Sequence, residues 1–317
     1  MHHQSSKKYM NKLRIGIQGI GGVGGYFGGL LADKYHESEN IEIVFITKPE
    51  TKTLLQDNGL QLILPEGSKT IFTHVLDAYE KTEPFDLLIN TVKSYSLEES
   101  LLSIKHLIGR NTILMPLQNG IDAAQRMQKL FPNNIVLEAC VYIVAQLTAP
   151  GVVQVNGNMR KLHFGSDAVS AMMLKYLEQL FTEAGIECYL SPDIKQVIWK
   201  KFIFVSSIAS VTSYLDVVIG KVLEDKNYRE LLIKAMEEMQ SIALAQNITL
   251  PESIIETTLS ELEKLHYEAT ASMHRDFMAG RKTEFESLTK YVSDAGKELG
   301  IETKVYDQMV EALSKSI

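Results

Sequence analysis

Residues Leu13 to Gly24 read LRIGIQGIGGVG, a short hydrophobic run followed at once by the pattern G-x-G-x-x-G. This pattern is informative where it directly follows a strand and opens a helix, and Gly22–Tyr35 is a helix candidate. The first glycine then permits a tight turn, the second lets the backbone approach a pyrophosphate, and the third allows close packing of helix on strand. The helix N-terminus offers free N–H groups to the anion. The stretch therefore predicts a dinucleotide-binding site made by Gly19, Ile20, Gly21, Gly22, Val23 and Gly24.

The first half of the chain alternates β-branched runs with helical patterns, which is typical of a parallel sheet with crossover helices. The predicted strands are Leu13–Gln18, Ile41–Thr47, Asp86–Val92 and Asn111–Leu117, and the predicted helices are Gly22–Tyr35, Leu97–Leu107 and Gly120–Leu130. Ser96 with Glu99 three residues later matches a capping box and predicts a helix start. Turn-like residues 148–151 and Asn156-Gly157 then separate three predicted antiparallel strands: Cys140–Gln146, Gly151–Val155 and Lys161–Phe164. A predicted helix, Ala171–Ala184, and a predicted strand, Ile186–Leu190, follow them.

From Pro192 onward the strand signal nearly vanishes, and apolar residues recur at spacings of three and four. The predicted helices are Lys195–Leu215, Asp225–Ala245, Pro251–Ala271, Glu284–Leu299 and Lys304–Ser314. Because proline fits the first turn of a helix, Ser191-Pro192 marks the domain boundary. We expect a Rossmann-type α/β dinucleotide-binding domain over residues 1–191 and an all-α substrate domain over residues 192–317.

Charge and cysteine content exclude several classes of protein. The 317 residues carry a net charge of −7, and a nucleic-acid-binding protein would need a basic face that is not evident. The two distant cysteines, Cys140 and Cys188, exclude a disulfide framework and a cysteine-based zinc site, and they suit a reducing compartment. No H-E-x-x-H, G-x-S-x-G or C-x-x-C motif is present, so no metal site is expected.

The apolar segments do not indicate a membrane protein. The segment Met1 to Asn11 is polar and basic, lacks the long apolar run of a secretory signal, and is interpreted as a loose terminus. Phe202 to Ile219 has the length of a membrane span, but its serines and Asp216 favour a buried helix. We expect a soluble cytoplasmic protein without nucleic-acid or membrane partners. The helical domain has enough apolar surface for a homodimer, although burial within one chain explains the same residues.

The end of the second predicted strand bears on the choice between NAD and NADP. NAD sites place an acidic residue about twenty positions after the glycines to hold the ribose hydroxyls. Here the strand ends Phe45-Ile46-Thr47-Lys48, with no carboxylate at its tip. Thr47 can donate a hydrogen bond and Lys48 supplies a positive charge, which suits a 2′-phosphate, and Lys52 can help from the next helical turn. Taken alone, Lys48 is better interpreted as a solvated surface lysine, but the missing acid favours NADPH as the cofactor.

Four later motifs follow one another along the chain: Asn90-Thr91-Val92-Lys93, Leu117-Gln118-Asn119-Gly120, Trp199-Lys200-Lys201, and Ser272-Met273 with Asp276 and Thr283-Glu284. With them the chain resembles the ketopantoate reductase (2-dehydropantoate 2-reductase) family from Leu13 to about Ile301. The resemblance implies NADPH-dependent reduction of the small 2-keto acid ketopantoate to pantoate, in pantothenate and coenzyme A biosynthesis. Because hydride transfer to a ketone leaves alkoxide charge on oxygen, such a site needs a proton donor.

The resemblance also implies a role for each motif residue. Lys201 is the general acid, Asn119 places nicotinamide and substrate, and Lys93 contacts the cofactor near the substrate. Ser272 lies near the substrate carboxylate, and Glu284 hydrogen-bonds in the active site. Ordinary structural roles remain open for each: a strand-end lysine for Lys93, an Asn-Gly turn for Asn119, and a helix-start carboxylate for Glu284.

The chain departs from the family on the helix that carries Lys201. The family usually has asparagines four and eight residues after this lysine, where this sequence has Val205 and Ala209. Ser206 or Ser207, on a different face, is expected to compensate in part. Two lost polar contacts cost about 1–3 kcal/mol each when substrate groups stay unpaired. The alternatives are therefore a reductase of another small 2-keto or 3-keto acid, or a non-catalytic NADP(H)-binding sensor.

Overall fold

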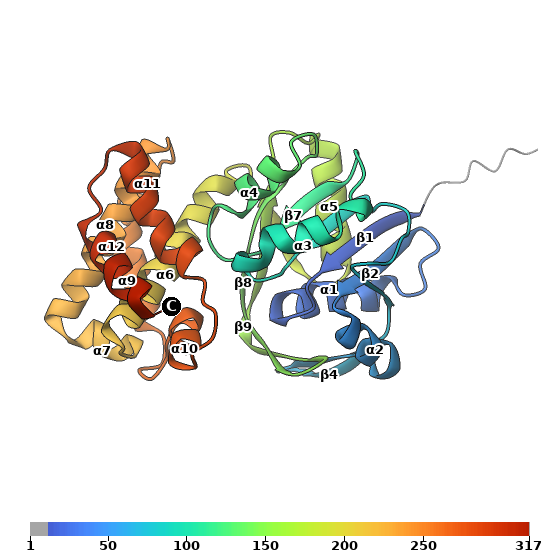
Figure 1. Cartoon of the computed structure of the whole chain (residues 1–317), viewed down its shortest axis with the longest axis horizontal. Helices are drawn as coiled ribbons and strands as arrows, with labels where there is room; N and C mark the ends of the chain where they lie inside the picture. The colour runs from blue at the N-terminus through green and yellow to red at the C-terminus, as the bar shows by residue number, and fades with distance from the viewer. Residues whose placement is uncertain (1–11, 317) are drawn as a thin grey trace, which may run out of the picture.

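The computed structural model describes residues 12–316, so the expected loose terminus, Met1 to Asn11, lies outside the described residues. The chain forms an α/β domain that runs through strand β10 (Glu187–Leu190) and a helical domain that begins with helix α6 (Ile194–Leu215). Figure 1 shows the two domains side by side, with α6 leading from one into the other. The predicted fold class, a Rossmann-type α/β domain followed by an all-α domain, is confirmed.

The first sheet is parallel throughout and follows the order β5-β2-β1-β6-β7. Its central strands are buried on both faces, which explains their nearly continuous hydrophobic sequences. Helix α1 packs on one face, and helices α3 and α4 pack on the other. The strands are β1 (Leu13–Gln18), β2 (Ile41–Thr47), β5 (His74–Asp77), β6 (Leu87–Asn90) and β7 (Ile113–Pro116), and the helices are α1 (Gly22–Tyr35), α2 (Pro49–Asn58), α3 (Leu97–Ser103) and α4 (Ala123–Leu130).

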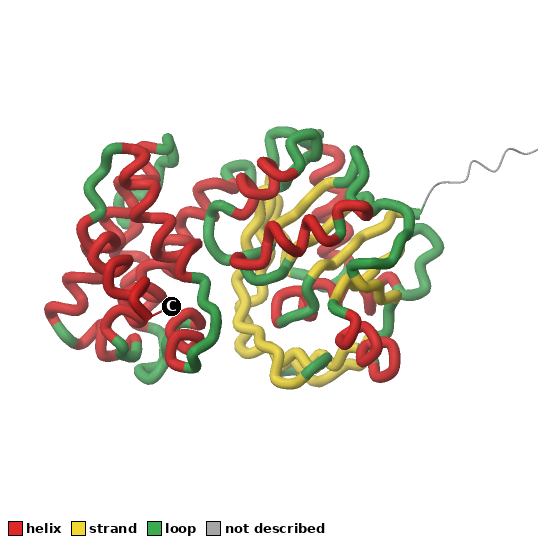
Figure 2. The backbone as a smooth tube through the Cα atoms, in the orientation of Figure 1, coloured by secondary structure: helices red, strands yellow, loops and turns green. Residues whose placement is uncertain are grey.

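A second sheet follows the order β10-β9-β3-β4, with β8 antiparallel to β9. It covers the far side of α1, so one hydrophobic core joins both sheets through this helix. In Figure 2 its strands curve along the edge of the α/β domain. Asn156-Gly157 was wrongly predicted as a turn: it lies within β9, where the pairing with β8 shifts register between Tyr142 and Val144. The remaining elements are β3 (Leu60–Leu64), β4 (Gly67–Ile71), β8 (Glu138–Ala149), β9 (Val152–Gly165) and α5 (Ala171–Glu183).

The helical domain packs around α6, which is apolar over most of its circumference and more than half buried. The helix predicted over Pro251–Ala271 is shorter, because α9 ends at Glu263 and a loop leads to α10. The helix predicted over Glu284–Leu299 begins with a π-helical turn, η3. The elements after α6 are α7 (Ile219–Glu224), α8 (Lys226–Ala245), α9 (Ile254–Glu263), α10 (Ser272–Met278), η3 (Glu286–Lys290), α11 (Tyr291–Leu299), α12 (Lys304–Leu313) and the 3₁₀ turn η4 (Ser314–Ser316).

The helix starts show which capping predictions hold. Ser96 ends the 3₁₀ turn η1 (Ser94–Ser96) and is the N-cap of α3, so the predicted helix start is confirmed, but its side chain makes no capping hydrogen bond and the predicted capping box does not form. The predicted helix Leu97–Leu107 is split, because α3 ends at Ser103 and the separate 3₁₀ turn η2 (Lys105–Leu107) follows. Contrary to the prediction, Pro192 does not lie in the first turn of α6 but precedes the N-cap residue Asp193, which accepts a hydrogen bond from Gln196 N at 3.3 Å. Within residues 12–316, no helix is long and apolar enough to cross a membrane.

Candidate active site

The glycine turn lies where the first sheet changes direction. The chain crosses from β1 to β2 on one side and continues to β6 on the other, so a crevice opens at the carboxyl ends of β1 and β6. Gly19 follows β1 with a φ of 92°, and a side chain there would lie 2.9 Å from the backbone nitrogen of Val92, just after β6. Only glycine fits this approach, so the turn and the loop after β6 line one crevice.

The first turn of α1 is open to this crevice. Gly21 caps the helix without any side-chain hydrogen bond, and an added Cβ on this residue would meet no atom within 4 Å. A Cβ on Gly24, by contrast, would collide with Gly19 O and Thr91 Oγ1. Open space therefore lies beside Gly21, at the end of α1 where the first backbone N–H groups have no partner within the helix, whereas Gly22 and Gly24 pack closely against neighbouring backbone. This arrangement suits a pyrophosphate, so the predicted glycine residues fit a dinucleotide.

Thr47 and Lys48 lie beside the same crevice, at the end of β2. Thr47 is partly buried, and Lys48 is exposed at the N-cap of α2. Lys52 points elsewhere: its ammonium forms ion pairs with Glu80 and, at 3.7 Å, with Asp77. The expectation that Lys52 helps to bind a 2′-phosphate is therefore not supported by its contacts, and Lys48 is left as the cation at this strand end.

A buried amide network underlies the crevice. Asn90 at the end of β6 donates to Gln18 Oε1 at 2.6 Å and accepts from the side chain of Gln118. Gln18 in turn donates to the carbonyl of Ser100 at 2.6 Å. All three amides are at least nine-tenths buried, so they fix the ends of β1, β6 and β7 relative to one another. The sequence motifs include Asn90 and Gln118 but did not predict this network, because hydrogen bonds between amides on different strands produce no pattern in the adjacent sequence.

Lys201 and Asn119, which are predicted site residues 82 positions apart, meet directly. Lys201 Nζ donates to Asn119 Oδ1 at 3.0 Å and lies 5.9 Å from the centroid of the Tyr142 ring. Burial lowers the pKa of Lys201 below the ordinary lysine value, while the nearby Cys140 and Glu284 act in the opposite direction. A lysine with a lowered pKa releases its proton more readily, which a general acid requires. The neighbouring Lys200 makes no ion pair with any described residue.

Lys93 and Glu284 join the two domains. Lys93 Nζ, in the loop after β6, lies 3.3 Å from Glu284 Oε2 and 4.0 Å from Asp276 Oδ2, both in the helical domain. The Glu284 side chain is 3% exposed, whereas that of Lys93 is 48% exposed. Glu284 also precedes η3, and such π-helical turns occur frequently at functional sites.

Ser272, unlike the pairs Lys201–Asn119 and Lys93–Glu284, makes no hydrogen bond to another predicted site residue within residues 12–316. It opens α10, and Asp276 lies one turn later on the same face of this helix. Because Asp276 reaches Lys93, Ser272 lies on the side of α10 that faces the Lys93–Glu284 pair. This placement is compatible with the predicted substrate contact.

The serines of α6 do not replace the missing asparagines. Ser206 donates to Leu288 O at 2.5 Å and bonds to the Tyr306 hydroxyl at 2.8 Å, and Ser207 donates to Ile203 O at 2.5 Å. Both serines are fully buried in the helical core, so the expected compensation is wrong. On the face of Lys201, the next turns carry the partly buried Val205 and the buried Ala209.

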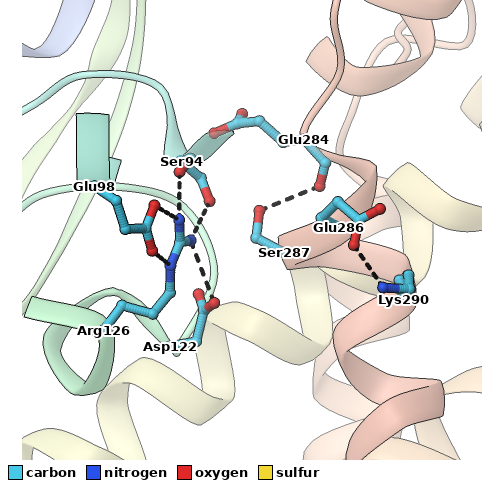
Figure 3. A network of polar contacts seen from close by, with 8 residues as sticks. All are labelled: Ser94, Glu98, Asp122, Arg126, Glu284, Glu286, Ser287 and Lys290. Carbon is cyan, nitrogen blue, oxygen red and sulfur yellow. Dashed lines mark hydrogen bonds and ion pairs between the residues drawn. The ribbon is translucent and has the colours of Figure 1, made fainter. Parts of the chain in front are cut away.

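A cleft of about 640 Å³ separates the two domains beside Glu284. One wall comes from η1 and α4, the other from η3 and α11. Figure 3 shows Ser94, Asp122 and Arg126 on one wall and Glu284 and Ser287 on the other. Within the part of the chain that the structure describes, no cluster of His, Cys, Asp or Glu could hold a metal ion.

Comparisons with known proteins identify relatives of both domains. The family model "Ketopantoate reductase PanE/ApbA" matches residues 15–168, and its C-terminal counterpart matches residues 193–316. The uncharacterized oxidoreductase YkpB of Bacillus subtilis is 24% identical over 303 residues, covering 93% of this chain and 98% of its own. The 2-dehydropantoate 2-reductase of Aquifex aeolicus is 26% identical over 301 residues, covering 90% and 91%.

Solved structures share the fold over nearly the whole chain. The 2-dehydropantoate 2-reductase of Porphyromonas gingivalis superposes with a TM-score of 0.82 at 27% identity, covering 96% of this chain and 99% of its own. A ternary complex of D-mandelate dehydrogenase with NADH and anilino(oxo)acetate superposes with a TM-score of 0.84 at 24% identity, covering 96% and 98%.

Proposed function

Because the chain belongs to the ketopantoate reductase family of oxidoreductases, we propose that it reduces ketopantoate (2-dehydropantoate) to pantoate with NADPH. This reaction is a step of pantothenate and coenzyme A biosynthesis. The observation that carries the proposal is the hydrogen bond between Lys201 and Asn119, which joins a partly buried lysine of the helical domain to the carboxyl end of the parallel sheet. A proton donor therefore lies at the crevice edge that suits a dinucleotide.

The glycine turn at Gly19–Gly24 would hold NADPH, which when bound would supply a hydride to the C2 carbonyl carbon of the keto acid. Lys201 donates a proton from Nζ to the oxygen that becomes the alkoxide, and its positive charge stabilises the negative charge that develops there. Asn119 holds the ammonium through Oδ1 and so orients the donated proton. The lowered pKa of Lys201 keeps the cost of this proton transfer small.

The remaining predicted residues bind the substrate. Ser272 and Lys93 hold its carboxylate, and Glu284 accepts a hydrogen bond from its hydroxyl group. Because Lys93 and Glu284 come from different domains, their 3.3 Å contact keeps the domains together around the substrate and excludes water.

NADPH is proposed over NADH because of the strand end at Thr47 and Lys48. No carboxylate stands at the tip of β2, which ends Thr47-Lys48, and Lys48 offers a positive charge for a 2′-phosphate. D-mandelate dehydrogenase, which shares the fold, was solved with NADH, so NADH is the cofactor against which the proposal must be tested. Titration of both cofactors by fluorescence tests the choice: a tenfold tighter binding of NADH would refute it.

Two alternatives retain the fold and the cofactor. Val205 and Ala209 present no polar group where the hydroxylated end of ketopantoate would lie, which favours a different small 2-keto or 3-keto acid. A non-catalytic NADP(H)-binding sensor is the second alternative, and the retained Lys201 and Glu284 argue against it.

NADPH oxidation, followed by absorbance with ketopantoate and a panel of other keto acids, separates the three functions. Rapid turnover of ketopantoate supports the proposed function. Turnover of another acid alone supports the first alternative, and NADPH binding without turnover of any acid supports the sensor.

A further inference from the structure

Arg126 on α4 makes a dense set of contacts beside the proposed site. Its Nε and Nη2 atoms donate to the two carboxylate oxygens of Glu98, each at 2.6 Å. Nη1 donates to Ser94 Oγ at 3.0 Å and to Asp122 Oδ2 at 3.3 Å, and Nη2 also donates to Ser94 O at 2.8 Å. Figure 3 shows the guanidinium at the centre of these groups. Such a bidentate, planar arrangement is geometrically specific and cannot be reproduced by a lysine.

These contacts join the two loops that carry predicted site residues. Ser94 directly follows Lys93, and its carbonyl and hydroxyl are both held by Arg126. Asp122 lies three residues after Asn119 and caps the helix that carries Arg126. The guanidinium therefore ties the loop after β6 to the loop after β7, on the side that faces the helical domain.

The position of these loops decides contacts across the interdomain cleft. Lys93 meets the buried carboxylate of Glu284. Gly120, in the loop after β7, has a φ of 97° and lies close to the helical domain: an added Cβ would be 3.4 Å from the Cβ of Ser287 and 3.4 Å from Asp122 Oδ1. Among the described residues, Arg126 is the one whose side chain bonds to the backbone of Ser94. Without this bond the loop after β6 could shift, and a small shift would move the ammonium of Lys93 away from Glu284.

We propose that Arg126 is a positioning residue for the reaction, acting through Lys93 by fixing the backbone that follows it. This inference rests on the proposed function and adds a residue that the motifs do not contain. Without the guanidinium, Glu98 and Asp122 would face each other as two carboxylates without their shared cation, and the buried Ser94 would lose two partners. The loop after β6 and the loop after β7 would then separate. Arg126 contacts Ser94 and Asp122 in these loops and does not itself contact Lys93 or Asn119.

A double-mutant cycle tests the inference. Displacement of an aligned group by about 1 Å can cost up to about 100-fold in rate, so we expect Arg126→Ala to lower kcat/KM about 10- to 100-fold in the unsubstituted protein. In a Lys93→Ala background the same change should cost less than about threefold, since the group through which it acts is absent. Arg110→Ala is the matched control, because Arg110 is exposed and bonds to no described residue; it should leave kcat/KM unchanged.

Two further measurements keep the test decisive if Arg126→Ala folds poorly. Arg126→Lys keeps the charge and the aliphatic stem but loses the bidentate geometry, so it should also lower kcat/KM, and again only when Lys93 is present. Hydrogen–deuterium exchange should become faster in residues 93–98 of both Arg126 variants and stay unchanged in Arg110→Ala. Equal losses in both backgrounds, or full activity of Arg126→Lys, would overturn the inference. Failure of the unsubstituted protein to reduce any keto acid would instead refute the proposed function on which the inference rests.

Discussion

Alanine substitutions at Gly24 and at Gly21 perturb one turn in two different ways. A methyl group on Gly24 would occupy the space of Gly19 O and Thr91 Oγ1. Neither neighbour can move freely, because Thr91 donates to Gln18 O at 3.0 Å and Gly19 O accepts from the N–H of Gly21 at 3.1 Å. A methyl group on Gly21 would touch no protein atom within 4 Å and would project into the crevice proposed for the pyrophosphate.

The magnitudes follow from these surroundings. Overpacking costs about 1–3 kcal/mol, and we expect about 3 kcal/mol for Gly24→Ala because backbone atoms must shift. At about 2–4 °C per kcal/mol, the melting temperature should fall by roughly 6–12 °C. Gly21→Ala only exchanges a helix N-cap residue and should cost less than about 1 kcal/mol. Losing one hydrogen bond to a charged phosphate is worth about 1.5–3 kcal/mol, so NADPH binding should weaken roughly 10- to 150-fold.

Thermal unfolding followed by circular dichroism and NADPH titration followed by fluorescence measure the two effects separately. We expect Gly24→Ala to lose stability and Gly21→Ala to lose NADPH affinity with nearly unchanged stability. An equal drop in melting temperature for both variants would show that the open space beside Gly21 is not there in solution. Unchanged NADPH affinity in Gly21→Ala would show that the pyrophosphate lies elsewhere.

Four other predictions concern individual side chains. Lys201→Ala should lower kcat by roughly 10²- to 10⁴-fold while Lys200→Ala changes it little, and the reverse result would assign the general acid to Lys200. Because burial lowers the pKa of Lys201 and the acid must be protonated, kcat should be constant at low pH and fall as pH rises through that lowered pKa; a profile that stays flat up to the ordinary lysine pKa of about 10.4 would contradict this. Lys48→Ala should weaken NADPH binding about tenfold and leave NADH binding unchanged, as compared by titration. Burial raises the pKa of Cys140 to about 11 and of Cys188 to about 12, so iodoacetamide at about pH 8 should label both thiols only after unfolding, as mass spectrometry would show.

Much of the fold could be predicted because its signals are local. A hydrophobic run, a glycine turn and a helix are contiguous between Leu13 and Tyr35, and α6, α8 and α12 are long and periodic. The elements that were missed are short or mostly exposed. Strand β4 reads GSKTI and buries only Ile71, so it has no alternating pattern to detect. The hairpin β8–β9 was broken in the prediction because Asn-Gly usually marks a turn, whereas here it forms an irregularity within one long strand.

The candidate site divides in the same way. Motifs named Lys93, Asn119, Lys201 and Glu284 from the order of residues, but no pattern gives the distances between them. The pairs that meet are separated by 82 and 191 positions. The buried amides below the crevice and the contacts of Arg126 belong to no motif. They depend on which strands are neighbours, and that is a property of the assembled sheet.

The sequence by itself determined the two kinds of domain, the glycine turn and the residues capable of proton donation, because backbone geometry and side-chain chemistry depend on a few adjacent residues. Only the tertiary structure decided that Ser206 and Ser207 face the helical core, that Lys52 pairs with Asp77 and Glu80, and that Lys201 meets Asn119. The physical reason is that burial, ion pairing and the pKa of Lys201 depend on groups brought together from distant parts of the chain, and packing alone sets those distances.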